Sequence, residues 1–222
     1  MATVTAHQPI DMDDAYFWYG TVVRATASMI QVRSGSLTQT YTGSFTYDTR
    51  LGTIKSGTMT YVLNGNDRMN GSSGGDVIKS YGGDDQLYGN GGNDVLKGGT
   101  GNDLLAGGAG MDRLTGGSGR GIFRFDTAPG SDNRDVITDY VVADDTIQLE
   151  NAIFTRLTKT GVLAAANFRV GNKAADANDH VFYDKATGGL FYDADGSGSG
   201  AAVQIALLGK GLALTAADFL VT

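Results

Sequence analysis

The sequence predicts an all-β protein built around a parallel β-roll, and three features of one stretch support this prediction. Written nine residues at a time, the stretch from Val62 to Arg124 forms seven rows that stay in register. The fourth residue of every row is glycine, the sixth is aspartate in six rows, and the eighth is apolar throughout. A fixed period of this kind indicates a solenoid, in which each repeat stacks on its neighbours.

Each row divides into a six-residue turn and a three-residue strand. Glycine in the turn permits positive φ and lets backbone carbonyls point inward, while the strand points one apolar side chain into the roll and two side chains outward. Two rows then make one coil, so that rows two apart lie side by side at about 4.8 Å, the spacing of hydrogen-bonded strands. We expect this stacking to bring the sixth-column carboxylates into a line along each edge.

These lines of carboxylates predict calcium sites between the turns. Like charges in such a line repel one another unless cations lie between them. Calcium takes about six to eight oxygen ligands from carboxylates and carbonyls, whereas magnesium needs a stricter octahedron. A fifth site beside Asp103 is expected to be weak or absent, because Gly121 stands where the next aspartate would be. The row spacing therefore predicts about four sites with two aspartates each, at Asp67/Asp85, Asp76/Asp94, Asp85/Asp103 and Asp94/Asp112.

Residues 1–61 predict a small antiparallel meander that precedes the roll. They are rich in threonine, tyrosine and valine with rough two-residue alternation, which is typical of strands. The expected strands are Thr21–Thr26, Met29–Ser34, Leu37–Asp48 and Thr53–Leu63. The segment from Tyr16 to Tyr19 is wholly aromatic and includes the only tryptophan, Trp18. Packing against the meander is its expected role, and an exposed sugar-stacking platform is the alternative.

Residues 125–222 predict a second β-rich cap made of shorter strands. These strands are expected at Asp135–Val141, Thr146–Glu150, His180–Asp184, Gly189–Asp193 and Ala201–Leu208. Helical turns are expected near residues 164–167 and after Thr215, which forms a capping-box pattern with Asp218. We therefore divide the chain into an N-terminal cap (1–61), the roll (62–124) and a C-terminal cap (125–222), which form one continuous body.

The composition excludes several classes of protein. The 222 residues carry a formal charge of −7 and no clustered lysine and arginine, which argues against nucleic acid as a partner. There is no cysteine for a disulfide or a thiolate metal site. No apolar run approaches the roughly 18 residues that span a bilayer, and the first residues lack the pattern of a cleaved signal peptide. Of the 24 acidic residues all but Glu150 are aspartate, which is typical of loops and oxygen-ligand cation sites.

The rows resemble the RTX family of calcium-binding nonapeptides, whose pattern is GGxGxDxUx. The resemblance implies a right-handed parallel β-roll in which aspartate carboxylates and turn carbonyls bind calcium. It places candidate ligands at the sixth-column aspartates and at turn glycines, namely Asp67, Asp76, Asp85, Asp94, Asp103, Asp112, Gly74, Gly83, Gly92, Gly101, Gly110, Gly99 and Gly108.

The C-terminal part resembles the region that follows the roll in RTX proteins of the serralysin type. The similar segments are 135–149, 190–208 and 214–222. In that family this region caps the roll and carries an uncleaved signal for the type I secretion machinery, which implies a secreted, extracellular protein. By the same resemblance Asp139 and Asp145 bind a further ion, and capping of turns is the alternative role for both.

No catalytic constellation is found in the sequence. The zinc protease of serralysin-type relatives needs H-E-x-x-H, whereas the only histidines here, His7 and His180, are in no such motif. The segment Gly71–Gly75 fits G-x-S-x-G, but it lies inside a repeat turn rather than at a strand-to-helix elbow. Asp193–Gly196 imitates the start of an EF-hand loop, but Gln204 stands where the bidentate glutamate is needed.

The outward side chains of alternate rows predict a weakly basic strip. Lys79, Lys97 and Arg113 lie on one face together with Val77 and Val95. An acidic polysaccharide is the candidate ligand for this strip, and an ordinary solvated face is the alternative.

The sequence as a whole predicts a secreted calcium-binding roll protein without catalytic activity, which acts as a calcium-dependent binding or extracellular-matrix component. We expect it to fold where calcium is abundant, because metal binding energy becomes folding energy. One alternative is an accessory module of an extracellular enzyme, such as a protease, a lipase or a polysaccharide-modifying enzyme. Met1 and the secretion-type C-terminus favour a stand-alone protein. A further alternative makes the N-terminal meander the working module and the roll a device for folding and export.

Overall fold

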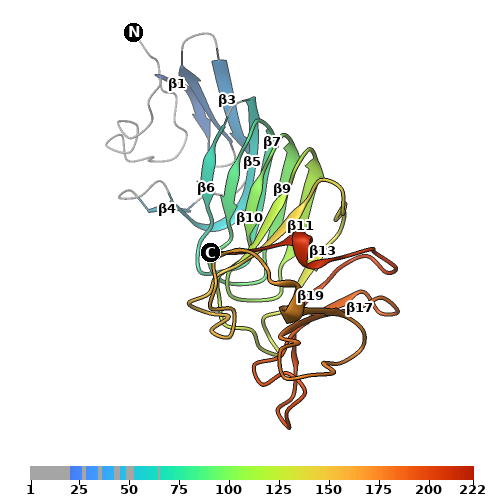
Figure 1. Cartoon of the computed structure of the whole chain (residues 1–222). Helices are drawn as coiled ribbons and strands as arrows, with labels where there is room; N and C mark the ends of the chain where they lie inside the picture. The colour runs from blue at the N-terminus through green and yellow to red at the C-terminus, as the bar shows by residue number, and fades with distance from the viewer. Residues whose placement is uncertain (1–20, 27–28, 35–36, 43–45, 49–52, 65) are drawn as a thin grey trace.

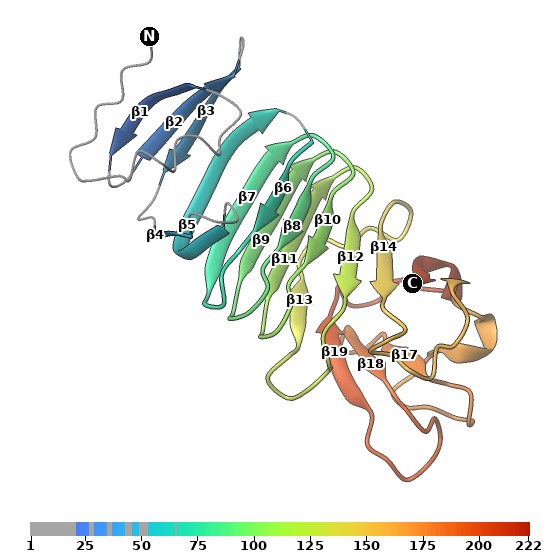
Figure 2. The same ribbon diagram turned by 90° about the vertical axis from the view of Figure 1, so that its left-hand side faces the viewer.

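The structure is a computed structural model that describes residues 21–26, 29–34, 37–42, 46–48, 53–64 and 66–222, with side chains described from residue 66 onward. Its strands form two sheets, one of thirteen strands and one of seven. Successive strands of the roll alternate between the two sheets, which face each other as two layers (Figures 1 and 2). This arrangement confirms the expected all-β fold and the β-roll.

The thirteen-stranded first sheet contains the N-terminal strands, every second strand of the roll and part of the C-terminal cap. Its path runs β1-β2-β3-β5-β7-β9-β11-β13-β19-β18-β17-β16, with β4 paired to β5. In that order the strands are β1 (Thr21–Thr26), β2 (Met29–Ser34), β3 (Leu37–Thr42), β5 (Thr53–Asn64), β7 (Asp76–Gly82), β9 (Val95–Thr100), β11 (Arg113–Ser118), β13 (Asp135–Ile137), β19 (Val203–Leu207), β18 (Gly189–Tyr192), β17 (Val181–Asp184), β16 (Phe168–Val170) and β4 (Thr46–Asp48).

The seven-stranded second sheet contains the other strands of the roll and the end of the chain. Its path runs β15-β20-β14-β12-β10-β8-β6. Its strands are β15 (Gly161–Val162), β20 (Phe219–Val221), β14 (Thr146–Leu149), β12 (Ile122–Phe125), β10 (Leu104–Ala106), β8 (Gln86–Tyr88) and β6 (Arg68–Asn70). Within the described residues the helical elements are two 3-10 turns, η2 (Ala165–Asn167) and η3 (Ala216–Asp218).

The register confirms that two rows make one coil. Ile78 pairs with Leu96, and Leu87 pairs with Leu105, so each residue lies beside the residue 18 positions further on. All neighbouring strands from β5 to β13 and from β6 to β14 are parallel. The coil therefore continues past residue 124 into β13 and β14, and β19 and β20 extend it further.

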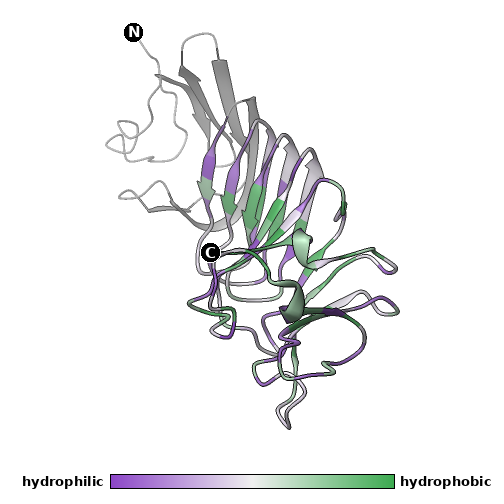
Figure 3. Cartoon of the chain, in the orientation of Figure 1, coloured by the Kyte–Doolittle hydropathy of each residue, from purple (hydrophilic) through white to green (hydrophobic). Residues whose placement is uncertain are grey.

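The core of the roll is the eighth column of the rows. Its side chains lie between the two sheets, where Figure 3 shows apolar residues along the strands. The residues flanking each of them on the strand point outward and are mostly more exposed, although Ala106 is also buried. Burial of each large apolar side chain contributes about 1.5–3 kcal/mol. The buried column consists of Met69, Ile78, Leu87, Leu96, Leu105, Leu114 and Phe123 and continues with Ile137, Ile147 and Phe219.

The two sides of the coil differ in strand length, which corrects the expectation of a three-residue strand in every row. The second-sheet strands β6, β8 and β10 do have three residues, but β7 has seven and β9 and β11 have six. The extra residues belong to the turn. They keep pairing with the next coil, as Gly99 does with Tyr81 and with Gly117.

The flanking strands lie where the sequence predicts them, but the expected strand Leu37–Asp48 is divided into β3 and β4, and the expected Asp135–Val141 is shortened to β13. The N-terminal strands β1, β2, β3 and β5 form an antiparallel series, and β5 then pairs in parallel with β7. In the C-terminal cap β17, β18 and β19 are antiparallel. The capping box of Thr215 and Asp218 is present at the start of η3. The aromatic segment from Tyr16 to Tyr19 lies outside the described residues.

Candidate metal centre

The turns of the roll depend on backbone conformations that favour glycine. In five consecutive rows the second and fourth residues both have positive φ. Gly92, for example, has φ +101°, and a Cβ placed on it would lie 2.5 Å from the backbone of Gly74 in the preceding coil. Gly74 itself is not among the residues with positive φ. The second-column residues are Tyr81, Asn90, Gly99, Gly108 and Gly117, and the fourth-column residues are Gly83, Gly92, Gly101, Gly110 and Gly119.

The sixth-column aspartates form two lines, one along each edge of the roll. One carboxylate oxygen of each aspartate from Asp85 to Asp112 accepts a hydrogen bond from the backbone N–H of the aspartate one coil earlier. The N···O distances are 2.8 Å for Asp67–Asp85, 2.7 Å for Asp76–Asp94, 2.9 Å for Asp85–Asp103 and 2.7 Å for Asp94–Asp112. The structure thus brings together the four pairs that the row spacing predicts.

Each of the six sixth-column aspartates also has a buried carboxylate oxygen that accepts no hydrogen bond. This oxygen is Oδ1 in Asp76, whose Oδ2 accepts from the N–H and the hydroxyl of Ser72. Buried polar atoms in proteins are almost always paired, so an unpaired one needs an explanation. In the remaining five the atom is Oδ2, and they are Asp67, Asp85, Asp94, Asp103 and Asp112.

The unpaired oxygens lie against glycines that leave no room for a side chain. A Cβ on Gly89 would overlap Oδ2 of Asp94 and the carbonyl oxygen of Gly107 in the next coil, and a Cβ on Gly98 would overlap Oδ2 of Asp103. Carboxylate and carbonyl oxygens therefore converge where the turns stack. Oxygen donors of both kinds are the ligands that calcium takes, so these residues fit the metal that the repeats imply.

Burial raises the pKa of four of these carboxylates and so makes them hard to ionise in the absence of a cation, namely Asp67, Asp94, Asp103 and Asp112. It raises the pKa of Asp67 to about 6 and that of Asp103 to about 6, with a smaller contribution from the charge of Asp85 in both cases. The pKa of Asp94 rises to about 7, because of burial and then the charges of Asp112 and Asp76. A bound cation would remove this cost by neutralising the paired charges.

Backbone carbonyls must complete any site in the roll. Among the described residues no three histidine, cysteine, aspartate or glutamate side chains gather closely enough to hold a metal by themselves. Each predicted pair supplies two carboxylates, which is fewer ligands than calcium requires. The arrangement therefore fits only a cation that accepts carbonyl oxygens as well.

Asp139 and Asp145 differ from the six aspartates of the columns. Both oxygens of Asp139 accept backbone N–H groups, from Gly116 at 3.0 Å and Gly117 at 2.8 Å. Both oxygens of Asp145 do the same, from Gly121 at 2.8 Å and Val141 at 2.8 Å. This geometry favours the capping role for both residues over the binding of a further ion.

Asp135 belongs to one of the lines and is missing from the sequence prediction. Its Oδ1 accepts from the N–H of Asp112 at 3.1 Å, and the residue is 4% exposed. Burial, followed by the charge of Asp112, raises its pKa to about 8. The run Asp135-Val136-Ile137 repeats the Asp-x-apolar pattern of the rows and could have identified it. The insertion before it breaks the nine-residue register and hides the match.

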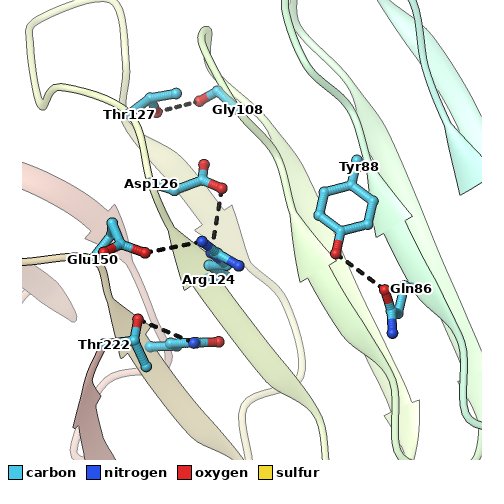
Figure 4. Close-up of polar contacts among 9 residues, drawn as sticks. Gln86, Tyr88, Gly108, Arg124, Asp126, Thr127, Glu150 and Thr222 are labelled. Carbon is cyan, nitrogen blue, oxygen red and sulfur yellow. Dashed lines mark hydrogen bonds and ion pairs between the residues drawn. The ribbon is translucent and has the colours of Figure 1, made fainter. Parts of the chain in front are cut away.

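The basic strip lies on the outer face of the first sheet. Lys79 pairs with Lys97, and Val95 pairs with Arg113. None of the three cations takes part in the ion pairs found among residues 66–222, which involve Arg124 and Arg169. On the second sheet, by contrast, Arg124 is paired with Asp126 and Glu150 (Figure 4).

The other candidates for chemistry have structural roles where they are described. His180 is 4% exposed, and its Nδ1 lies 2.8 Å from the carbonyl oxygen of Asp193. Asp193 accepts from the N–H of Asp195 within the same loop. His7 lies outside the described residues. No helix in the described part of the chain is long and apolar enough to cross a membrane.

Comparison with known proteins identifies the repeats. The family model of the RTX calcium-binding nonapeptide repeat, in four copies, matches residues 61–96 and 88–123. No curated protein matches the chain. A solved structure entitled "Solution Structure of AlgE6R3 subunit from the Azotobacter vinelandii Mannuronan C5-epimerase" is similar at 26% identity and a TM-score of 0.27, covering 72% of this chain and 81% of that one. The match to the family model shows that the chain contains calcium-binding repeats of the RTX type, and the strand register shows that they form a β-roll.

Proposed function

We propose that this protein is a secreted, non-catalytic calcium-binding roll that folds when it binds calcium outside the cell. The observation that carries the proposal is the set of six aspartates, five buried and Asp67 half-buried, each with a buried carboxylate oxygen that has no hydrogen-bond partner. They would supply about four ions, each bound between two stacked turns by two aspartates and by carbonyls of the turn glycines. The full set of side-chain ligands in this proposal is Asp67, Asp76, Asp85, Asp94, Asp103 and Asp112.

Calcium would act as a switch for folding. Without it, folding must bury ionised carboxylates beside one another or protonate them, and either choice opposes the roll. With it, the free energy of binding is added to that of folding. Extracellular calcium modules have dissociation constants of about 10⁻⁴–10⁻³ M. An affinity in this range would keep the chain unfolded at cytosolic calcium levels and folded at the calcium levels outside the cell.

Calcium titration of the intact chain tests this proposal. Far-UV circular dichroism should show a gain of β structure as calcium is added and its loss when a chelator follows. Magnesium at the same concentration is the control, because it requires a stricter octahedron. A spectrum indifferent to calcium and chelator would contradict the proposal.

Export by the type I secretion machinery is part of the proposal. The absence of cysteine suits a chain that crosses to the outside without needing disulfides, and the calcium switch suits a chain exported unfolded. Expression beside a type I exporter, with and without its ATPase, should place the protein in the medium only when the exporter is active. Equal release from both strains would exclude this route.

The basic strip is proposed to bind an acidic polysaccharide. The column that contains Arg113 runs from β5 to β13, and the column that contains Lys79 and Lys97 runs from β5 to β11, with no acidic residue in either of them. A basic strip with no acidic residue to repel an anion, on a protein that is acidic overall, favours an anionic ligand. Replacing both lysines by glutamine should weaken binding to an acidic polysaccharide, whereas replacing the exposed Lys159 and Lys185 should not. Equal affinities of the two double variants would contradict the assignment.

The accessory-module alternative and the stand-alone protein predict native products of different length. A roll that serves an extracellular protease, lipase or polysaccharide-modifying enzyme could belong to a longer chain. The intact mass of the secreted protein distinguishes the two, because the stand-alone reading requires 23.1 kDa. A much larger product would support the enzyme-associated role.

A further inference from the structure

An open groove lies in the C-terminal cap, outside the aspartate lines of the roll. It covers the hairpin of β17 and β18, toward the end of the molecule away from β5 and β7 (Figure 2). One wall is the segment 172–175 that follows β16, and the other belongs to the loop 193–202 between β18 and β19. The volume of the groove is about 670 Å³, within the range of about 300–1,000 Å³ that is typical of small-molecule sites.

The floor of the groove is aromatic. Phe182 on β17 pairs with Phe191 on β18, and their rings stack with centroids 4.8 Å apart and planes 10° apart. The strand neighbours Tyr183 and Leu190 belong to the hydrophobic core, so the two phenylalanines point to the opposite side of the sheet. Phe191 is half-buried and presents part of its ring to the groove. Such a floor suits the apolar face of a ring-shaped ligand.

Two side chains of opposite charge line the groove from its two walls. Asp193 is 5% exposed, and its Oδ1 accepts the N–H of Asp195 at 3.2 Å. Burial, followed by the side chain of Asp195, raises the pKa of Asp193. Lys173 on the other wall is exposed, and neither it nor Asp193 takes part in the ion pairs found among residues 66–222. The two charges sum to zero, which favours a neutral ligand with both donors and acceptors.

Backbone hydrogen bonds hold the two walls in place. The N–H of Ser197 donates to the carbonyl of Asp176 at 2.8 Å and so joins the two loops. The N–H of Gly200 donates to Oδ2 of Asp195 at 2.8 Å within the second loop. A Cβ on Gly196, which has φ +62°, would lie 2.6 Å from the carbonyl oxygen of Asp176. Walls that are fixed before a ligand arrives reduce the conformational entropy lost on binding.

The chemistry of the groove distinguishes among classes of ligand. An anion attracted by Lys173 would be repelled by Asp193, and a wholly apolar ligand would leave this buried carboxylate without donors. Within the described residues no group of three acidic or histidine side chains could hold a metal here. Hydroxyl groups, in contrast, donate to a carboxylate and accept from an ammonium or an amide. A sugar ring carries several hydroxyls together with a C–H face that can pack on an aromatic ring.

We propose that this groove binds one neutral sugar ring, as the terminal unit of a glycan. Hydroxyls of the ring donate to the carboxylate of Asp193 and accept from Lys173 and from the side-chain amide of Asn172, while the C–H face lies against Phe191. This site goes beyond the proposed function. It lies apart from the aspartates of the roll, and it takes an uncharged ligand rather than the acidic polysaccharide proposed for the basic strip.

Sugar binding by the calcium-loaded full chain tests the inference. The probes are the methyl glycosides of glucose, galactose and mannose, and saturation-transfer NMR should detect binding of at least one of them. Asp193→Asn keeps the acceptor for the N–H of Asp195 and should weaken that binding about tenfold or more, because it removes a charged hydrogen-bond acceptor. Phe191→Leu keeps an apolar side chain without the ring and should weaken it several-fold.

Two control variants should bind the sugar as the wild type does. Asp176→Asn is the matched control for Asp193→Asn, because Asp176 is exposed and its Oδ1 accepts the N–H of Asn178 in a similar way. Replacing both Lys79 and Lys97 by glutamine removes charge from the basic strip and leaves the groove intact.

The outcomes separate the inference from the proposed function. No binding of any of the three glycosides would overturn the inference, and so would equal affinities of the wild type and Phe191→Leu, which decides the question even if Asp193→Asn does not fold. Methyl glucuronide bound more tightly than methyl glucoside would overturn the assignment of a neutral ligand. None of these results affects the calcium-dependent folding of the roll, which the calcium titration tests by itself.

Discussion

Asp94 occupies the middle of its line, with Asp76 on one side and Asp112 on the other. It therefore belongs to two of the proposed sites, whereas Asp67 belongs to one. Asp94→Asn should reduce the number of bound calcium ions by two and Asp67→Asn by one, as counted by native mass spectrometry. Asparagine keeps the oxygen that accepts the backbone N–H, so the comparison isolates the lost charge. Equal losses in the two variants would show that the sites are not shared along the line.

Gly92 and Gly74 occupy the same column but differ in conformation. Gly92 has φ +101° and no room for a Cβ, whereas the nearest atom to a Cβ on Gly74 is Oγ of Ser72 at 3.9 Å. Gly92→Ala should lower the free energy of unfolding of the calcium-loaded protein by about 1–3 kcal/mol or more, because it adds backbone strain and a clash. Gly74→Ala should change it by much less. Urea denaturation at saturating calcium measures both, and similar losses would contradict the strain argument.

The raised pKa values of the columns predict how the calcium-free roll responds to pH. A carboxyl with a pKa near 3.8 when unfolded and about 6 or 7 when folded, as in Asp103 and Asp94, binds more protons in the folded state. Its contribution to stability is fully present below about pH 4 and is lost as the pH rises through 6 to 7.

Acidification should therefore stabilise the calcium-free roll and weaken calcium binding. Lowering the pH from 8 to 5 in a chelator should increase β structure by circular dichroism, and the apparent affinity for calcium should fall over the same range. Protons and calcium compete for the same oxygens, so the two effects have one cause. A calcium-free chain that loses structure on acidification would contradict these pKa shifts.

At the scale of the element, the row is the unit that the sequence predicts well. Glycine, aspartate and apolar residues recur at fixed positions, so the turn, the carboxylate lines and the core column follow from local chemistry and one stacking rule. The greater length of the strands in the first sheet cannot be predicted from the repeat pattern alone. Tyr81 and Gly99 belong to the turn pattern, and only the pairing of neighbouring coils makes them part of strands.

The contacts of the C-terminal cap were harder to predict because they join distant segments. Asp135 was missed because five inserted residues interrupt the period, and β13 pairs with β19, which is far along the chain. The position of η3 was predictable because its capping box is a four-residue pattern. Local signatures are visible in the sequence, whereas pairings across long separations depend on the folded chain.

The capping box of η3 should have a measurable effect on stability. Thr215 accepts from the N–H of Ala217, and Asp218 accepts from the N–H and hydroxyl of Thr215. Thr215→Ala should lower the free energy of unfolding by about 0.5–2 kcal/mol, as loss of an N-cap does elsewhere. Thr160→Ala, at an exposed position, is the control. Thermal denaturation in excess calcium checks both, and equal stability of the two variants would contradict a stabilising cap.

At the scale of the whole molecule, stability should vary along the roll. Each coil contacts only its neighbours, so a stack of coils folds and opens by propagation from one to the next. The coils between Asp67 and Asp112 depend on calcium in the proposed function. The last coils are also joined by the hydrogen bonds of Asp139 and Asp145 to Gly116, Gly117 and Gly121, which involve no metal.

Hydrogen exchange after chelation should reveal this difference. Amides of β11 to β14 should stay protected longer than those of β6 to β9, as measured by mass spectrometry of peptides. Asp139→Ala should shorten that protection, because it removes two of the metal-free hydrogen bonds. Uniform loss of protection along the roll would contradict the prediction.

The carboxylates of Asp139 and Asp145 therefore make the two ends of the roll differ in their dependence on calcium. Because their hydrogen bonds to Gly116, Gly117 and Gly121 involve no metal, we expect the C-terminal cap to stay folded as a template when calcium is scarce. When calcium is added back, the remaining coils would then fold onto this template one at a time, from the C-terminal end toward β6. The order of folding would follow from the position of the coils that are held by backbone N–H groups and need no metal.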